Sequence, residues 1–198
     1  MGNSYYDYYM LGRPILNLAM QSQTTNENRS YNTRRLGDGR MAKLTGTNHG
    51  DAANKLFAFY VEKAHQLEES GQYFMAAIAL AFGVEAAILT YLLVEFGEEN
   101  GGELEIPDKS NFFDLIGAAN EIDVLRAPID TPSHVRDDGQ RPQHIAKDVV
   151  DKIRKFRNLI HPAVALREGY DPSTFSVENL AEFKDMYASV MHSLMYNL

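Results

Sequence analysis

A long apolar run with an acidic residue at its centre constrains the fold of this chain more than any other feature. The run extends from Phe74 to Phe96, about the 20 residues that a helix needs to cross a bilayer. Glu85 stands in its middle, where a carboxylate costs about 2.5–3.5 kcal/mol on insertion scales, and no Lys or Arg cluster brackets the run. A helix that is apolar on all sides is typical of the middle of a helical bundle. We therefore expect a buried core helix and no membrane span.

Apolar residues recur at three- and four-residue steps on either side of this run, a spacing that predicts amphipathic helices. Helices are expected over about residues 51–70, 72–96, 144–161 and 176–197, with one more that begins after Ser110 as a candidate cap and carries Ile122 and Leu125. Gly71 closes the first of them. No stretch alternates apolar and polar residues between turn signals, so no sheet is expected. The predicted fold class is an all-α bundle of about five main helices.

Two segments differ from this helical pattern. Residues 1–50 are rich in Asn, Ser, Thr, Gly and Arg and predict an irregular N-terminal arm, so that the helical domain occupies residues 51–198. A break of about 18 residues, longer than most connections in compact domains, is marked by Pro128, Pro132, Gly139 and Pro142. Such a loop is either functional or mobile.

The amino-acid composition limits the kinds of catalysis and ligand binding that are expected of this chain. The chain has 198 residues and no cysteine, so catalysis by a thiolate is excluded. Its formal charge is −8, which disfavours indiscriminate binding along nucleic acid. The histidines show no metal-ligand spacing and there is no phosphate-binding glycine loop, so neither a metal nor a cofactor is expected. The start lacks the pattern of an export signal, and a cytoplasmic location is the expectation.

The most informative segment lies on the predicted fourth helix. At about 100° per residue, four polar side chains fall within one arc of about 100°: Arg154, Arg157, Asn158 and His161. Pro162 disfavours helical geometry at His161 and therefore predicts that the imidazole stands at the end of the helix. Between Arg141 and Arg167 there are seven Lys or Arg against two Asp. This local excess of positive charge is typical of a phosphate-facing patch.

Together with its predicted helices, this segment makes the chain resemble the HEPN domains over about residues 53–197. The resemblance includes a helix pair joined through Ser70-Gly71-Gln72-Tyr73, a short third helix, and the segment Arg157-Asn158-Leu159-Ile160-His161-Pro162 before a terminal helix. Active members of that family carry an Arg, a polar residue after it, and a His with four to six residues between. Three residues separate Arg157 from His161, whereas six separate Arg154 from His161 but Lys155 follows that arginine. Either arginine can take the functional place.

The resemblance implies a helical bundle that acts as a homodimer and, in active members, cleaves RNA without a metal ion. His161 would deprotonate the adjacent 2′-hydroxyl, Arg154 and Arg157 would stabilise charge on the phosphoryl oxygens, and Asn158 would position them. It further implies the toxic half of a defence or toxin-antitoxin pair, with an antitoxin as protein partner.

The same residues admit an interpretation without catalysis. Arg and Asn before a His-Pro step can cap carbonyls or pair with a buried acid, and Glu85 is the obvious partner, because a carboxylate inside an apolar helix needs one. In that case the chain would be a catalytically silent module for dimerisation or for binding RNA or a protein partner. Whether it is an enzyme stays open on the sequence.

Overall fold

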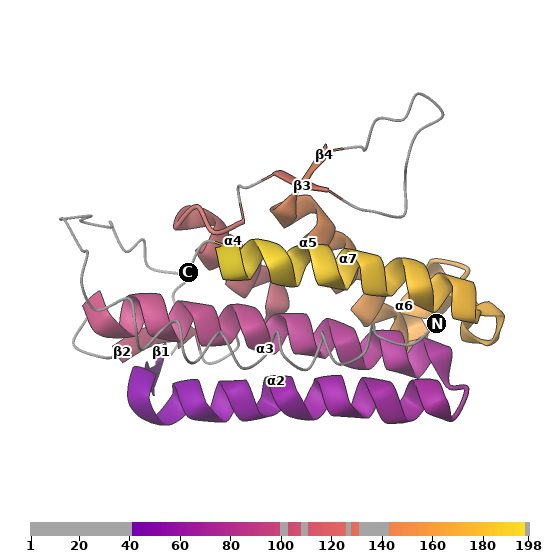
Figure 1. The fold of residues 1–198 in the computed structure, drawn as a ribbon, viewed down its shortest axis with the longest axis horizontal. Coiled ribbons are helices and arrows are strands. Elements are labelled where there is room, and N and C mark those ends of the chain that lie inside the picture. Colours follow the sequence, from indigo (N-terminus) through magenta and orange to yellow (C-terminus); the bar gives the residue numbers. More distant parts are fainter. Residues whose placement is uncertain (1–40, 100–102, 108–110, 126–127, 131–142, 197–198) are drawn as a thin grey trace.

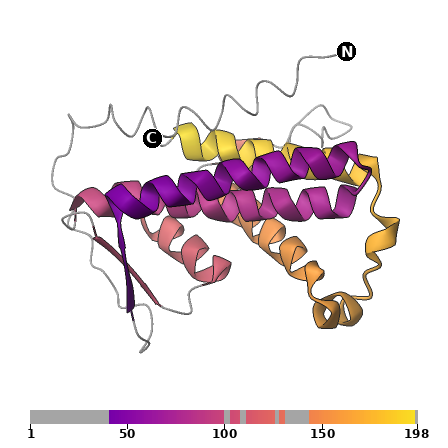
Figure 2. The ribbon, with the colours of Figure 1, turned by 90° about the horizontal axis from the view of Figure 1, so that it is seen from below.

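The computed structural model describes residues 41–99, 103–107, 111–125, 128–130 and 143–196. Its frame consists of three long helices that lie side by side: α2 (Gly46–Glu69), α3 (Tyr73–Glu99) and α7 (Val177–Tyr196). Helix α3 runs between the other two (Figure 1). Two shorter helices, α4 (Phe112–Glu121) and α5 (Ala146–Arg157), cross α3 obliquely on its remaining side (Figure 2). The predicted all-α bundle of five main helices is confirmed.

The middle position of α3 follows from its sequence. Partners pack against it from three directions, so it has little face left for water, and the side chains of Ala77, Ala81, Val84 and Ile88 are almost completely inaccessible. Tyr73–Leu93 has the length and composition of a membrane span, but 83% of its most apolar window is buried inside the bundle. The sequence-based prediction of a buried core helix is therefore confirmed.

The turn between α2 and α3 depends on Gly71, as predicted. Its φ of 75° lies in the left-handed region that glycine adopts without steric cost. Its N–H donates to the carbonyl of Glu68, and the N–H of Gln72 donates to the carbonyl of Leu67. These two hydrogen bonds make a Schellman motif, which satisfies the last carbonyls of α2 and reverses the chain.

Helix α4 starts at a different cap from the one predicted. Asn111, not Ser110, is the N-cap: its side chain accepts from the N–H groups of Phe113 and Asp114, while the Asp114 carboxylate accepts from the Asn111 N–H. This reciprocal capping box satisfies N–H groups that the helix itself cannot. The helix ends at Glu121, so the predicted helical residues Ile122 and Leu125 stand in the turn that follows.

The predicted helix over residues 144–161 spans only Ala146–Arg157 as α5, and two further elements follow it. Helix α5 ends at Arg157, a 3-10 turn η1 spans Asn158–Ile160, and a short helix α6 spans Pro162–Arg167. His161 between them is extended, with φ −82° and ψ 120°. Proline excludes helical geometry from the residue before it and suits the first position of a helix, so Pro162 stops one helix and starts the next.

Five aromatic rings fix the chain after α6. Phe74 of α3 contacts Phe156, Tyr170 and Phe175, and Phe156 also contacts Phe183 of α7, with ring centroids 4.9–6.0 Å apart. The short 3-10 turn η2 (Pro172–Thr174) lies within this stretch. These rings attach the α6 end of the molecule to the bundle, because offset and edge-on aromatic pairs are favourable.

Two short antiparallel strand pairs, which the sequence analysis did not foresee, accompany the helices. Strand β1 (Met41–Thr45) pairs with β2 (Glu103–Pro107) at the end of the bundle opposite α6 (Figure 2). Strand β3 (Pro128–Asp130) pairs with β4 (Gln143–Ile145) and closes the base of the predicted long loop. Residues 1–40 of the predicted arm, and residues 131–142 of that loop with Pro132, Gly139, Arg141 and Pro142, lie outside the described residues.

Candidate functional site

Arg157 at the end of α5 points into the bundle. Its Nη1 donates to Oε2 of Glu85 on α3, and its guanidinium carbon lies 5.2 Å from the ring centroid of Phe82 and 5.1 Å from that of Phe112. The Arg157 side chain is 15% exposed and that of Glu85 is 24% exposed. Glu85 therefore has the partner that the sequence analysis named for it.

This arrangement explains how an acidic residue is accommodated in the core helix. The opposite charge of Arg157 compensates Glu85, and the rings of Phe82 and Phe112 contact the guanidinium by cation–π attraction. Removing one partner of such a pair leaves an uncompensated charge away from water, which is strongly unfavourable. The Arg157 side chain is therefore held in place by its contacts inside the bundle.

Arg154 lies nearly one turn earlier on α5, and its side chain is 19% exposed, close to the 15% of Arg157. Its Nε and Nη2 each lie 2.8 Å from Oδ1 of Asp151, and Lys155 reaches the other oxygen of that carboxylate at 2.8 Å. The pair of cations, Lys155 first and then Arg154, lowers the pKa of Asp151 below its usual value against the opposing effect of burial. The Arg154 guanidinium carbon is 5.3 Å from the ring centroid of Phe113.

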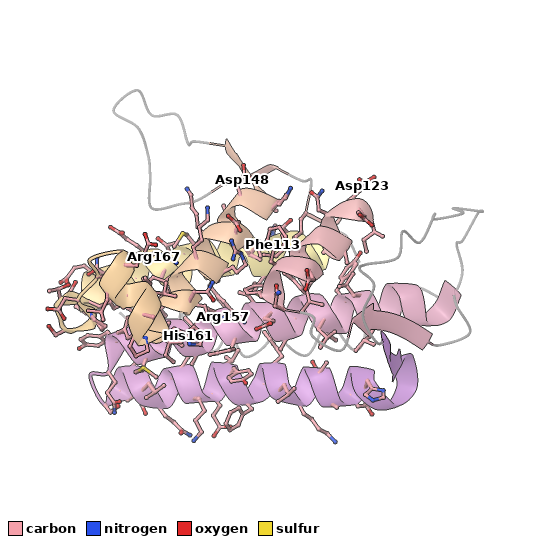
Figure 3. The ribbon with its side chains drawn as sticks, turned by 180° about the vertical axis from the view of Figure 1, so that it is seen from behind. Phe113, Asp123, Asp148, Arg157, His161 and Arg167 are labelled. Atoms are coloured by element: carbon pink, nitrogen blue, oxygen red, sulfur yellow. The ribbon has the colours of Figure 1, made fainter. Side chains whose placement is uncertain are left out.

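Two consecutive phenylalanines of α4 thus each contact one arginine of α5. The inner contact joins Phe112, which is completely buried, to Arg157. The outer contact joins Phe113, which is 61% exposed, to Arg154. The Phe112 ring belongs to the core, and the Phe113 ring faces solvent on the side of the molecule where α4, α5 and α6 lie in front of α3 (Figure 3).

The other two predicted site residues stand beyond the end of α5. Asn158 begins the 3-10 turn and is half-buried, and its carbonyl accepts from the His161 N–H at 3.0 Å. His161 is exposed at the start of α6, and its side chain makes no capping hydrogen bond to that helix. Figure 3 places Arg157 and His161 near the junction of α5 and α6.

The predicted common helical face is therefore wrong. That prediction required one α-helix through His161, but the 3-10 turn advances by about 120° per residue and His161 is extended. Arg157 pairs with Glu85 of the core helix α3, while Arg154 pairs with Asp151 of its own helix and contacts Phe113. The two arginines were expected to share one site, but they pair with different carboxylates: Arg157 with Glu85 and Arg154 with Asp151.

The segment around His161 combines positive charge with exposed apolar side chains. Six Lys or Arg stand against two Asp between residues 146 and 167. Ile160 is 37% exposed and Leu166 is 82% exposed, one on each side of His161. The sequence analysis did not single out these two residues, because exposure of an apolar side chain depends on where the helix breaks.

No other cluster with recognisable chemistry stands out in the described part of the chain. A small, mostly apolar hollow between α2, α3 and α7 lies beside the ion pair between Glu68 and Lys184, whose Nζ is 2.9 Å from each carboxylate oxygen. Over the same residues, no group of three or more His, Asp or Glu is placed to hold a metal ion. The candidate site is therefore the surface of α4, α5 and α6.

Comparison with known proteins gives no match: no family model, no curated protein and no solved structure matches this chain.

Proposed function

We propose that this chain is a HEPN-like helical bundle that serves as a binding and assembly module, in which the segment from Arg157 to Pro162 has a structural role. The pairing of Arg157 with Glu85 carries this proposal. An arginine that neutralises a carboxylate of the core helix, between two aromatic rings, is not free to stabilise charge on a phosphoryl oxygen.

Metal-independent RNA cleavage, as in a toxin or defence ribonuclease, is the second candidate, and one observation favours it. His161 is exposed, and six residues separate it from Arg154, whose partner Asp151 belongs to the same helix and not to the core helix α3. In such a reaction His161 would take the proton of the 2′-hydroxyl, whose oxygen would attack the adjacent phosphorus to form a cyclic phosphate. The bond to the 5′-oxygen would break, and His161 of the partner subunit would give this leaving oxygen a proton. Arg154 would then be the residue that stabilises the phosphoryl oxygens.

The assembly part of the proposal rests on the exposed apolar residues beside His161. Leu166 and Ile160 offer apolar surface within a charged segment, and a two-fold dimer would bury the same patch on both copies. Light scattering at tens of micromolar should therefore report a dimer for the wild-type chain and a monomer for Leu166→Asp. A wild-type monomer at that concentration would exclude this interface.

The two functions are separated by one cleavage experiment. Purified wild-type protein is incubated with labelled single-stranded RNAs of varied sequence in EDTA, beside His161→Ala and the control His192→Ala, which alters an exposed histidine on α7. The module predicts intact RNA with all three proteins. Cleavage by the wild type and by His192→Ala, abolished in a stably folded His161→Ala, would overturn the module and establish a ribonuclease.

A further inference from the structure

Helix α2 is an outer layer of the bundle: it packs on α3, and the side that α3 leaves uncovered faces solvent (Figures 1 and 2). Two large apolar side chains lie on that side, because Leu56 and Phe59 are each 49% exposed. They stand three residues apart and therefore share one helical face. Ala52, one turn before Leu56, is also exposed. The three residues form an apolar stripe at steps of four and three residues, the spacing by which helices pair in coiled coils.

The Phe59 ring has a defined position on this stripe. Its centroid lies 5.4 Å from that of Tyr60 in an edge-on contact, and Tyr60 stacks on Phe82 of α3 at 5.2 Å. Lys63 Nζ lies over the ring, 5.7 Å from its centroid, and donates to Oε1 of Gln66 at 2.8 Å. Half of Phe59 remains exposed beside this lysine. A side chain that is already ordered loses little conformational entropy when a partner covers it.

Two charges of opposite sign stand along one edge of the stripe. Lys55 and Glu62 are exposed and lie seven residues apart, so they occupy the same heptad position. In the described part of the chain Lys55 takes part in no ion pair, and Glu62 accepts from the neutral amide of Gln66 at 3.0 Å. Lys63 and Glu69 are the other exposed charges between residues 55 and 69. The charges balance, so this face fits a copy of itself better than a polyanion.

The order of the two edge charges selects the orientation of a paired helix. When two copies of α2 pack antiparallel about a two-fold axis, Leu56 of each copy lies against Phe59 of the other. The same edge of each helix then meets across the pair, which places Lys55 of each copy beside Glu62 of the other. A parallel pair would bring opposite edges together, and Lys55 would face Tyr60 instead. Antiparallel pairing therefore compensates both charges, and parallel pairing compensates neither.

We propose that the face of α2 around Leu56 and Phe59 is a second self-association surface, on which two copies pair antiparallel with reciprocal Lys55–Glu62 ion pairs. The inference rests on the proposed assembly role and extends it to a face separate from that of Leu166. A contact between two helix faces is small and therefore weak. Two different two-fold contacts on one chain link more than two copies, so the assembly grows beyond a dimer when the chain is concentrated.

The test exchanges charges in the Leu166→Asp background, where the proposed contact at α6 is removed. Sedimentation velocity at about 0.5 mM chain, which suits a weak contact, should show dimers of this reference chain. Lys55→Glu alone and Glu62→Lys alone should each be monomeric, because like charges would then oppose one another. An equimolar mixture of the two variants should dimerise again, since every opposed pair then has opposite signs.

Cross-linking tests the register, because the chain has no cysteine of its own. In the antiparallel pair Ala52 of one copy lies opposite Lys63 of the other, whereas the two Ala52 residues lie eleven positions apart, about 16 Å along the axis. A mixture of Ala52→Cys and Lys63→Cys chains should therefore be joined by a short bismaleimide. Either variant alone should stay unjoined.

Truncating the ring tests the apolar part of the contact. Phe59→Ala in the same background should weaken pairing by about tenfold or more, because the two-fold symmetry removes the ring from both copies. The matched control is Phe113→Ala, which truncates another exposed phenylalanine beside a cation and should leave pairing unchanged. Thermal melting of both variants checks that they remain folded, and equal loss of pairing in the two would contradict the α2 contact.

Three further results would overturn the α2 contact: a reference chain that is monomeric at this concentration, a mixture of charge variants that stays monomeric, or cross-linking of Ala52→Cys alone. The two contacts fail separately. A wild-type dimer that Leu166→Asp abolishes at every concentration refutes the α2 contact and leaves the contact at α6. A dimer that survives Leu166→Asp but is lost in Lys55→Glu refutes the contact at α6 and supports the α2 contact.

Discussion

Arg157 and Glu85, which stand 72 positions apart in the sequence, form an ion pair that joins the end of α5 to the middle of α3. The pair connects the apolar core helix with the segment that runs from Arg157 to Pro162. It also distinguishes the two arginines of α5, because Arg157 pairs with α3 whereas Arg154 pairs with Asp151 on its own helix.

Truncating Arg157 should destabilise the protein. Arg157→Ala leaves Glu85 without its partner and should lower the free energy of unfolding by about 3 kcal/mol, at the lower end for buried pairs since both side chains retain some solvent contact. The double variant Arg157→Ala/Glu85→Gln should recover part of that loss, because the stranded charge is gone. Urea denaturation of the two single variants and the double variant measures the coupling.

The control for this cycle is Arg167→Ala. Arg167 is exposed and its ion pair joins it to the neighbouring Glu168, so its removal should change stability by less than about 0.5 kcal/mol. If Arg157→Ala is as mild as Arg167→Ala, or if the double variant is no more stable than Arg157→Ala, the structural role of Arg157 is refuted.

Removing the His161 imidazole should have little effect on stability. His161 is exposed and its side chain does not cap α6, so His161→Ala should change the free energy of unfolding by less than about 0.5 kcal/mol. Pro162→Ala, in contrast, removes the residue that fixes the break between η1 and α6 and should be the more destabilising change. Thermal melts of the two variants in the same buffer show which substitution destabilises the protein more. A larger loss of stability in His161→Ala would show that the imidazole supports the fold.

Two glycines should respond in opposite directions to the same substitution. Gly71→Ala places a Cβ at φ 75° and should cost about 1 kcal/mol, although open space surrounds the position. Gly117→Ala lies within α4, also has open space, and should stabilise by about 0.5–1 kcal/mol, because alanine loses less backbone entropy in a helix. Denaturant midpoints of both variants test the pair, and a shift of the same sign in both would contradict the assignment of the turn.

Acid should weaken the network around Asp151. Lys155 and Arg154 hold the pKa of Asp151 below its ordinary value. The ionised carboxylate therefore contributes fully to folding stability above the unfolded pKa of about 3.9. That contribution is lost as the pH falls through the lower pKa of the folded state. The stability difference between wild type and Asp151→Asn should therefore shrink below about pH 4. Carboxyl NMR titration of Lys155→Gln should show the Asp151 pKa rising toward normal, and an unchanged value would refute the pairing.

Much of the architecture could be predicted from the sequence, because it depends on local patterns. The apolar run around Glu85 predicted the central helix, and Gly71 predicted the turn that follows α2. Pro162 predicted that no helix continues through His161, although α5 ends earlier, at Arg157. Each of these signals acts within a few residues, through burial of apolar surface or through an allowed range of backbone angles.

The position of the helix cap and the short strand pairs could not be predicted in the same way. Asn111 and Ser110 are both good caps by residue type, so residue type alone does not choose between them. Strand β1 pairs with β2, a partner about 60 residues away, and such pairing depends on how the helices between them bring the two segments together.

The sequence by itself determined that Glu85 would need a cation and that Arg154 and Arg157 were the residues able to contact either a buried acid or a phosphate. Only the tertiary structure decided between the two arginines. The crossing of α5 over α3 directs Arg157 toward Glu85 and leaves Arg154 with Asp151 and the exposed ring of Phe113. A carboxylate away from water binds the nearest cation that the packed helices direct toward it, and that direction is fixed by the packing of the whole bundle rather than by spacing along one helix.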